Sequence, residues 1–455
     1  MPTLRPPAVA GAFYPGDAKA LLSEVDELLE GVDGVEVRFG HPKVLIVPHA
    51  GYIYSGQTAA QAYSELAHAR GIVKRVVLLG PVHRVPVRGL ALPGAEFFAT
   101  PLGSIPIDAE AVQALSGLQQ VVTSAPAHAM EHSLEVQLPF LQRVLGTFSL
   151  LPLAVGDATR EQVAEVIERL WGGPETLIVI STDLSHYHEY EAARRIDHDT
   201  ANRIDRLETG LNHQQACGAT PLNGLLSLAQ KRGLAIRRLG VCNSGDTAGG
   251  RNRVVGYASF ALDESGAVSR EEAGRTLIGL ARASVGAKLV GHEPPKPGNA
   301  PWLQQPGATF VTLTKGGGLR GCIGSLAAHR CLGEDVIANA QAAAFGDPRF
   351  PPVTSAEWPS VQTEVSLLSP ARTIKFADEA ELLEKIVPGE DGLILEAAGK
   401  RGTFLPQVWE SLPDKHQFLT QLRLKAGLPA DFRLGRCRVQ RYRVAKWKQS
   451  DFPSH

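Results

Sequence analysis

The sequence has few cysteines and lacks any long apolar run. Its five cysteines, spread over 455 residues, are too few and too irregularly spaced for a disulfide framework. About 18 consecutive apolar residues, the length that a membrane-spanning helix requires, occur nowhere. The opening residues contain prolines and Asp17 where a signal peptide needs an apolar run of about 7–15 residues. These absences predict a cytoplasmic protein with no membrane segment, whose free thiols can bind metals or act as nucleophiles.

An excess of charge of one sign is also missing. The chain has 46 Lys and Arg against 47 Asp and Glu, which gives a net charge of -1. Because a basic excess is the footprint of a nucleic-acid-binding domain, we expect no nucleic-acid partner but a small-molecule or protein substrate. Apolar residues make up 44% of the chain and charged residues 20%, as in folded globular proteins. At roughly 150 residues per domain, the length predicts two to three domains.

The first part of the chain alternates apolar runs with amphipathic stretches. Helices are expected at 55–69, 133–145 and 160–171. The expected strands are listed in chain order: 43–48, 75–80, 148–156, 176–181, 235–242 and 254–262. Continuous apolar runs are typical of parallel strands buried on both faces. The pattern therefore predicts an α/β domain with a largely parallel central sheet flanked by helices.

A polar break at 263–269 separates this part from the rest. Ser269, followed by Glu272 and an apolar stretch, has the spacing of a helix-capping box. We therefore place the domain boundary near residue 265, with one domain over 1–265 and another over 266–455. The second domain combines strand-like runs at 308–313 and 361–368 with a helical stretch at 334–345, which predicts an α+β fold.

Polar residues follow several of the predicted strands of the first domain. Ten of the 14 histidines precede residue 260. His49, His83, the pair Asp183 and His186, and Cys242 each lie at or just past the carboxyl end of a strand-like run. In open α/β sheets this edge is where ligands and catalytic groups gather. The sequence therefore predicts one shared site at this edge.

These residue types are typical of a transition-metal site. Imidazole binds iron, copper, zinc or nickel, whereas thiolate favours softer ions such as zinc and Cu(I). Two histidines with Cys242 would leave a coordination position open, and two histidines with Asp183 would instead indicate non-heme Fe(II). Asp183 can alternatively orient a histidine, and His186 can act as an acid or base near neutral pH.

A second pattern competes for the role of metal site. His128, Glu131 and His132 match the H-x-x-E-H spacing of inverted zinc proteases. Pro126 precedes this segment and the apolar helical pattern begins only near Ser133, so the two histidines are expected on a loop. His132 alone can still point into the strand-edge site.

The segment 315–324, KGGGLRGCIG, is a candidate for a second site. Glycines let successive backbone N–H groups face an anion, and Arg320 adds a positive charge. In that setting Cys322, next to Gly321, can serve as a nucleophile, a redox group or part of an anion site. The alternative is a buried cysteine that packs in a tight turn against a strand.

Several blocks of the first domain resemble the Memo family, whose fold is similar to LigB-like, class III extradiol dioxygenases. The blocks are 5–17, 48–56, 80–84, 131–142, 181–190 and 242–247. The resemblance implies a metal site at His49, His83 and Cys242. Asp183, His186 and His132 would stand around it. Because the dioxygenases use two histidines and a glutamate on Fe(II), a third ligand at Cys242 puts ring cleavage in question and favours copper or another redox metal.

The second domain resembles the AMMECR family. The similar blocks are 316–326, 342–353, 364–370, 391–396, 402–410 and 418–429. In prokaryotes the two families are associated with a radical-SAM protein in the AmmeMemoRadiSam system. The resemblance therefore implies that this chain fuses two components of one process and has a radical-SAM protein as a partner.

The leading hypothesis is a metal-dependent oxidoreductase with one ion, Fe(II) or copper rather than zinc. His186 would carry protons, Asp183 would orient or ligate, and His132 would hydrogen-bond the substrate. Two alternatives stay open: a protein that binds copper or recognises a peptide without turnover, and a zinc-dependent hydrolase.

Overall fold

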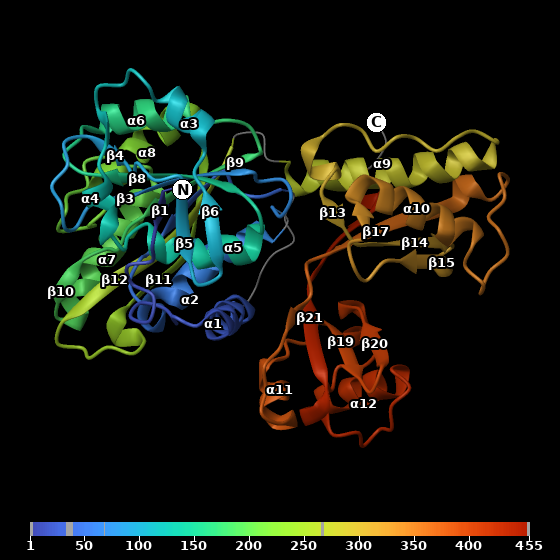
Figure 1. The fold of residues 1–455 in the computed structure, drawn as a ribbon. Helices are drawn as coiled ribbons and strands as arrows, with labels where there is room; N and C mark the ends of the chain where they lie inside the picture. Colours follow the sequence, from blue (N-terminus) through green and yellow to red (C-terminus); the bar gives the residue numbers. More distant parts are fainter. Residues whose placement is uncertain (1–2, 33–39, 68, 265–267, 453–455) are drawn as a thin grey trace. The chain divides into compact units, whose positions relative to one another are not determined.

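The computed structural model describes residues 3–32, 40–67, 69–264 and 268–452. They form two compact units, one of residues 3–32 and 41–264 and the other of residues 40 and 268–452. Figure 1 shows both. The boundary predicted near residue 265 itself falls outside the described residues. No helix within the described ranges has the length and apolar character needed to cross a membrane.

The first unit is built on a nine-stranded mixed sheet. Its strand order is β10-β12-β2-β9-β3-β8-β4-β7, and β11 pairs with β12. The strands are β2 (Val44–Val47), β3 (Arg75–Pro81), β4 (Leu90–Leu92), β7 (Val121–Thr123), β8 (Ser149–Val155), β9 (Thr176–Ser181), β10 (His186–His188), β11 (Ala235–Asn243) and β12 (Val254–Asp263). The central strands β2, β9, β3 and β8 are all parallel, and β2 and β9 are buried at every residue. The predicted α/β fold with a largely parallel sheet is confirmed.

Helices cover both faces of this sheet. On one face α6 (Arg160–Arg169), α7 (Tyr190–Asp205) and α8 (Ala219–Arg232) pack on Ile46, Leu79 and Ile180. α2 (Tyr52–Tyr63) packs on β2, β11 and β12, and it is joined there by α1 (Ala18–Glu30) and α5 (Leu138–Leu145). In Figure 1 α6 and α8 lie together, and so do α1 and α2. Shorter elements complete the unit: α3 (Ala109–Ala114), α4 (Ala125–Ala129) and a small sheet of β1 (Leu4–Arg5), β5 (Phe97–Thr100) and β6 (Gly103–Pro106).

Strand directions decide which residues meet at one edge. β2, β3 and β9 are parallel, so the segments that follow them, with His49, His83 and Asp183, emerge on the same side. β12 runs antiparallel to β2 and β11 antiparallel to β12, so β11 ends at that edge too. Cys242 pairs with Tyr257 of β12 and is therefore separated from β2 by a strand.

The second unit contains antiparallel sheets with helices, as the sequence predicts. One sheet has the order β15-β14-β17-β22 and the other β18-β21-β19-β20. Their strands are β14 (Thr309–Lys315), β15 (Gly318–Gly324), β17 (Val361–Leu368), β22 (Val444–Lys448), β18 (Arg372–Thr373), β19 (Gly392–Ala397), β20 (Lys400–Phe404) and β21 (Arg438–Tyr442); β13 (Pro306–Gly307) pairs with β16 (Arg330–Cys331). Helices α9 (Arg270–Leu289) and α10 (Leu332–Phe345) share the first core, and α11 (Glu379–Lys385) and α12 (Lys415–Lys425) the second.

Candidate metal site

Three imidazoles meet at the carboxyl edge of the first unit's sheet. His49 follows β2, His83 follows β3, and His132 lies in the segment between α4 and α5. One nitrogen from each lies within 4.8 Å of the others. The ring centroids are 5.3 Å apart for His49 and His83, 5.4 Å for His49 and His132, and 4.6 Å for His83 and His132. Three imidazole nitrogens at this spacing match the donor set of a transition-metal ion.

The tautomer of His49 follows from its neighbour Ser181. The Ser181 hydroxyl donates its one proton to the carbonyl of Ser133, at 2.6 Å. It must therefore accept from the Nδ1–H of His49, 2.9 Å away. The lone pair of His49 is then on Nε2, which leaves that nitrogen free for a metal.

Glu131 orients the other two rings. Its carboxylate accepts from the backbone N–H and the Nδ1–H of His83, at 2.6 and 2.9 Å, and lies 3.4 Å from Nδ1 of His132. Burial raises the pKa of Glu131, but the bond from His83 and the backbone N–H of Ser133 outweigh it and lower the pKa to about 2. A carboxylate behind a ligand histidine fixes the ring and strengthens it as a donor.

The site holds its histidines in the form that binds metals. Burial, with the neighbouring His132 and His83, holds the pKa of His49 well below its ordinary value. Burial also lowers the pKa of His132 to about 4, against the opposing effect of Glu131. These two imidazoles are therefore neutral at physiological pH, so metal binding needs no proton loss from them.

The H-x-x-E-H segment does not supply a pair of histidine ligands. Nε2 of His128 bonds to the carbonyl oxygen of Ala91, at 2.7 Å, and the ring lies against Phe98. His128 lies within the five-residue helix α4, so the expectation of a loop is wrong for it, while Glu131 and His132 lie beyond the helix and the i, i+4 geometry of a long helix is absent. As predicted, His132 alone joins the strand-edge site.

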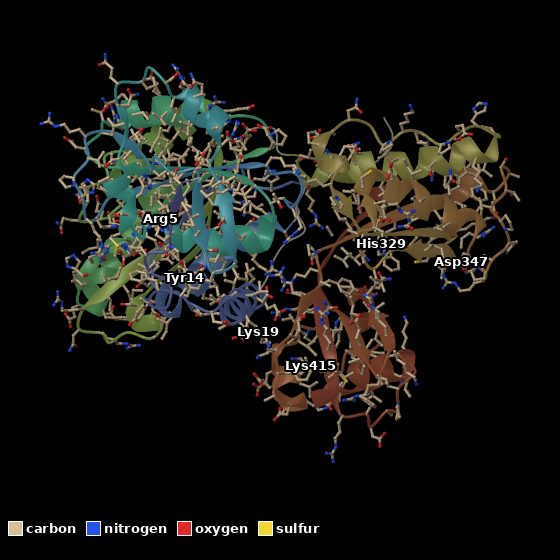
Figure 2. All side chains as sticks on the ribbon, in the orientation of Figure 1. Arg5, Tyr14, Lys19, His329, Asp347 and Lys415 are labelled. Carbon is tan, nitrogen blue, oxygen red and sulfur yellow. The ribbon has the colours of Figure 1, made fainter. Side chains whose placement is uncertain are left out.

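An N-terminal arginine fastens this segment. Arg5 donates to the carbonyls of His128, at 3.0 Å, and Glu131, at 2.6 Å, and forms a buried ion pair with Glu135. Glu135 also accepts from the Tyr14 hydroxyl at 2.6 Å. Arg5 and Tyr14 are labelled in Figure 2. The first residues of the chain thus hold the loop that carries Glu131 and His132.

Asp183 lies against His49 and is almost fully buried. Its Oδ1 accepts from the backbone N–H of His49 at 2.7 Å, and its Oδ2 lies 3.9 Å from Nε2 of the same residue. Burial raises the pKa of Asp183 to about 7, although the N–H groups of His49 and Ala50 oppose the shift. Asp183 therefore orients the segment that carries His49, as one of its two predicted roles requires.

Cys217, rather than Cys242, lies beside the imidazoles. The Sγ of Cys217 is 3.4 Å from Nε2 of His49 and accepts from the N–H of Asp183 at 3.3 Å. Burial raises the pKa of this thiol to about 12, with a further contribution from Asp183. The Sγ of Cys242 instead lies 3.0 Å from the hydroxyl of Thr58 on α2. Cys242 as a metal ligand stays a prediction that the observed contacts do not support.

Cys217 reaches the site from a connecting segment and not from the end of a strand. It belongs to the segment between α7 and α8, two residues before α8 begins. A bond from its N–H to the carbonyl oxygen of Asp183, at 3.2 Å, docks this segment on the end of β9. Because Cys217 lies in this connecting segment, a prediction from strand ends alone cannot find it.

A cleft of about 750 Å³ opens beside His83. His83, His186 and Cys217 line it, together with apolar wall residues such as Val87 and Val155. His186 donates its Nδ1–H to the carbonyl oxygen of Leu184 at 2.8 Å, which leaves Nε2 as the proton acceptor. Burial lowers the pKa of His186 from its ordinary value. The structure thus brings His83 and His186 together around one cleft.

The predicted second site lies on a strand rather than a loop. Gly316 and Gly317, both with positive φ, form the turn between β14 and β15, and Arg320, Gly321 and Cys322 lie within β15. Arg320 pairs with Glu357 at 2.7 Å. The N–H of Cys322 bonds to Asp347, at 2.8 Å, so it is not free for an anion. Asp347 is labelled in Figure 2.

Comparisons with known proteins identify both units. The family model described as Memo-like protein matches residues 5–261, more than half of the chain. The chain belongs to the Memo-like family. The AMMECR1 family model matches residues 278–447, so this chain joins a Memo-like unit to an AMMECR1 unit. Both resemblances seen in the sequence are thereby confirmed.

Curated relatives cover the Memo-like unit. A MEMO1 family protein of Aquifex aeolicus is 37% identical over 270 residues, which are 56% of this chain and 97% of that protein. A MEMO1 family protein of Methanosarcina acetivorans is 35% identical over 274 residues, 57% of this chain and 99% of that protein. The crystal structure of an uncharacterized protein from Pyrococcus horikoshii is 33% identical, covers 38% of this chain and 90% of that chain, and has a TM-score of 0.36.

Proposed function

We propose that the Memo-like unit is a metal-dependent oxidoreductase that binds one transition-metal ion through His49, His83 and His132. The observation that carries the proposal is the shared orientation of the three rings. Ser181 accepts from Nδ1–H of His49 and Glu131 accepts from Nδ1–H of His83, and one nitrogen of each of the three rings lies within 4.8 Å of the others. Packing alone does not require three imidazoles to bring one nitrogen each to a common point.

Cys217 favours a soft or borderline ion. Two ligands of a tetrahedral ion, with metal–sulfur and metal–nitrogen bonds of about 2.3 and 2.0 Å, lie about 3.5 Å apart. The Sγ of Cys217 lies 3.4 Å from Nε2 of His49, which fits a ligand next to that one nitrogen, while the ligand atoms mutually within 4.8 Å among the described residues are those of the three imidazoles. Imidazole with thiolate suits copper, iron or zinc and disfavours magnesium or calcium. Among these ions, Fe(II) or copper would supply one-electron chemistry, and only a five-coordinate ion would still accept oxygen or substrate beside the three histidines and Cys217.

The protein's own residues supply binding and proton transfer. The substrate would enter the cleft between His83, His186 and Cys217, whose walls are partly apolar. Nε2 of His186 would accept a proton from the substrate, because its Nδ1–H is already committed to Leu184. Asp183 would hold His49 in place through the backbone bond. A radical-SAM protein as the source or consumer of the substrate remains part of this proposal.

Metal analysis and oxygen uptake test the proposal. We expect one Fe or Cu ion per chain in protein purified without a metal-chelating tag, lost in His49→Ala and in His132→Ala. Exposed His198→Ala should keep the ion and serves as the matched control. Full metal content in both site variants would overturn the site. Metal binding without oxygen consumption or substrate turnover would instead support the second candidate.

That second candidate is a copper-binding protein without turnover. It is favoured by the closeness of Cys217 to His49, since three histidines and one thiolate would complete a four-coordinate set and leave no open position. Tight binding of Cu(I) under anaerobic conditions, with no oxygen use in air, is the result that distinguishes it. A zinc hydrolase based on His128 and His132 lacks support, because His128 is bonded to Ala91.

A further inference from the structure

A buried carboxyl group lies behind the segment that carries His186. Asp197 on α7 is only 2% exposed, and its Oδ1 accepts from the backbone N–H of Ser185 at 3.0 Å. Its Oδ2 makes no hydrogen bond of good geometry within the described ranges, and burial raises the pKa of this carboxyl group while the N–H and the side chain of Ser185 lower it. Burying a carboxyl group costs stability, so its contacts with the segment that carries His186 call for an explanation.

Strand β12 presses against the same carboxyl group. A Cβ added to Gly256 would lie 2.1 Å from Oδ2 of Asp197, so only glycine lets the two elements approach this closely. Gly256 also donates to the carbonyl oxygen of Ser185, at 2.9 Å, and accepts from the N–H of Leu184, at 2.8 Å. Leu184 and Ser185 are therefore held from one side by β12 and from the other by Asp197.

The residues that follow are in a strained conformation. Tyr187 has a φ of 63°, in the left-handed region that bulky side chains avoid. The pairing of β10 with β12 shifts register between His186 and His188. Tyr187 is 63% exposed, and both it and His186 line the cleft, with their ring centroids 5.7 Å apart. Strain of this kind persists only where the surroundings enforce it, and it gathers at functional sites.

We propose that Asp197 is a positioning residue, which with Gly256 locks the 184–188 segment so that Nε2 of His186 faces the cleft. The bond from Ser185 to Asp197 fixes the backbone immediately before His186. That backbone in turn supplies the Leu184 carbonyl that holds Nδ1 of His186. Without the carboxyl group the segment relaxes, and His186 loses both its orientation and its single tautomer. The importance of this for turnover rests on the proposed role of His186 as proton acceptor.

Nitrogen-15 NMR of histidine-labelled, full-length protein tests the inference without any substrate. In the wild type we expect the His186 ring as one tautomer, with the proton on Nδ1. Asp197→Ala should give a mixture of tautomers and move the protonation midpoint of His186 toward its ordinary value, a change of about tenfold in that equilibrium. Asp197→Asn keeps an acceptor for Ser185 and should restore the wild-type signals.

Two further variants keep the test decisive. Gly256→Ala displaces the same carboxyl group from the other side and should alter the His186 signals even if Asp197→Ala fails to fold. Asp205→Ala, at the end of the same helix, removes a surface ion pair with Arg238 and should leave them unchanged. Unaltered His186 signals in folded Asp197→Ala or Gly256→Ala protein would overturn the inference. Metal content and oxygen uptake are measured independently of the His186 signals, so they test the proposed function separately.

Discussion

At the scale of single residues, the groups that hydrogen-bond to the site histidines decide what the site can bind. Ser181 and Glu131 bond to Nδ1 of His49 and of His83, and these bonds determine which nitrogen of each of the two rings is free. Such partners typically contribute 10–100-fold to metal affinity. Which nitrogen of a histidine faces the ion therefore depends on hydrogen bonds that link distant parts of the chain.

Replacing Glu131 by glutamine tests this dependence. Glu131→Gln removes the negative charge behind His83 and His132 but retains the size of the side chain. We expect metal affinity to fall by about 10–100-fold, measured by competition with a chromophoric chelator. Exposed Glu161→Gln is the matched control and should bind as the wild type does. Equal affinity in Glu131→Gln would show that the carboxylate does not tune the site.

Cys217 and Cys242 can be distinguished as metal ligands by the absorption of bound Co(II). Co(II) bound with a thiolate ligand absorbs in the near ultraviolet through charge transfer from sulfur. We expect this band in the wild type and in Cys242→Ser, and its loss in Cys217→Ser, because only Cys217 touches His49. Loss of the band in Cys242→Ser alone would instead support the ligand set His49, His83 and Cys242 that the family resemblance implies.

Asp197 should also make the stability of the Memo-like unit depend on pH. Burial raises the pKa of Asp197 to about 6, against the opposing N–H of Ser185. As pH rises from about 4 to 6, the unfolded chain loses the proton while the folded chain keeps it, so the free energy of unfolding decreases. The loss amounts to about 2–3 kcal/mol above pH 6, at about 1.4 kcal/mol per pKa unit.

Urea unfolding at several pH values measures this effect. Asp197→Asn carries no ionisable group, so its stability relative to the wild type should increase between pH 4.5 and pH 7. Asp205→Asn provides the control on the same helix. A difference between Asp197→Asn and the wild type that is independent of pH would contradict the assignment.

At the scale of elements, the sequence predicts strands better than helix ends or loops. The runs at 43–48, 75–80 and 176–181 coincide closely with β2, β3 and β9, because buried parallel strands are apolar throughout. The helix expected at 133–145 begins as the 3-10 turn Glu135–Gln137, and α5 starts at Leu138 with Pro139 in its first turn. The helix expected at 55–69 extends instead from Tyr52 to Tyr63 and ends in a 3-10 turn.

The site was predictable only where a strand leads to it. His49, His83 and Asp183 follow central parallel strands, whose common edge is a consequence of topology. Cys242 is the penultimate residue of β11, which also ends at this edge, but β12 lies between β11 and β2. Cys217 and Glu131 come from connecting segments, whose paths depend on bonds such as those of Arg5 and Asp183 that no local pattern reveals.

The glycines of strand β15 give a prediction at this scale. A Cβ on Gly321 would lie 2.1 Å from the carbonyl oxygen of Ala343 in α10, whereas one on Gly318 would lie 3.6 Å from its nearest neighbour. Gly321→Ala should therefore destabilise the AMMECR1 unit by about 1–3 kcal/mol or more, and Gly318→Ala should have little effect. Tryptophan fluorescence during urea unfolding measures this, since four of the five tryptophans belong to this unit. Equal stability of the two variants would show that close packing does not explain Gly321.

At the scale of the whole molecule, one chain contains the Memo-like unit, where we propose a metal site, and the AMMECR1 unit. The metal ligands that we propose all lie in the Memo-like unit, while Arg320 and Cys322 belong to the AMMECR1 unit. Cys322→Ser should therefore leave the metal content at one ion per chain, measured by mass spectrometry of the purified protein. A lower metal content in that variant would mean that the second unit takes part in metal binding.

The central claim is that one ion lies among His49, His83 and His132. Anomalous diffraction at the cobalt edge, from crystals of the full-length protein grown with Co(II), tests it most directly. We predict a single peak in the Memo-like unit at coordination distance from one nitrogen of each of the three rings, with Cys217 as the nearest sulfur. A peak bound to Cys242 instead, or no peak at the three histidines, would contradict the account.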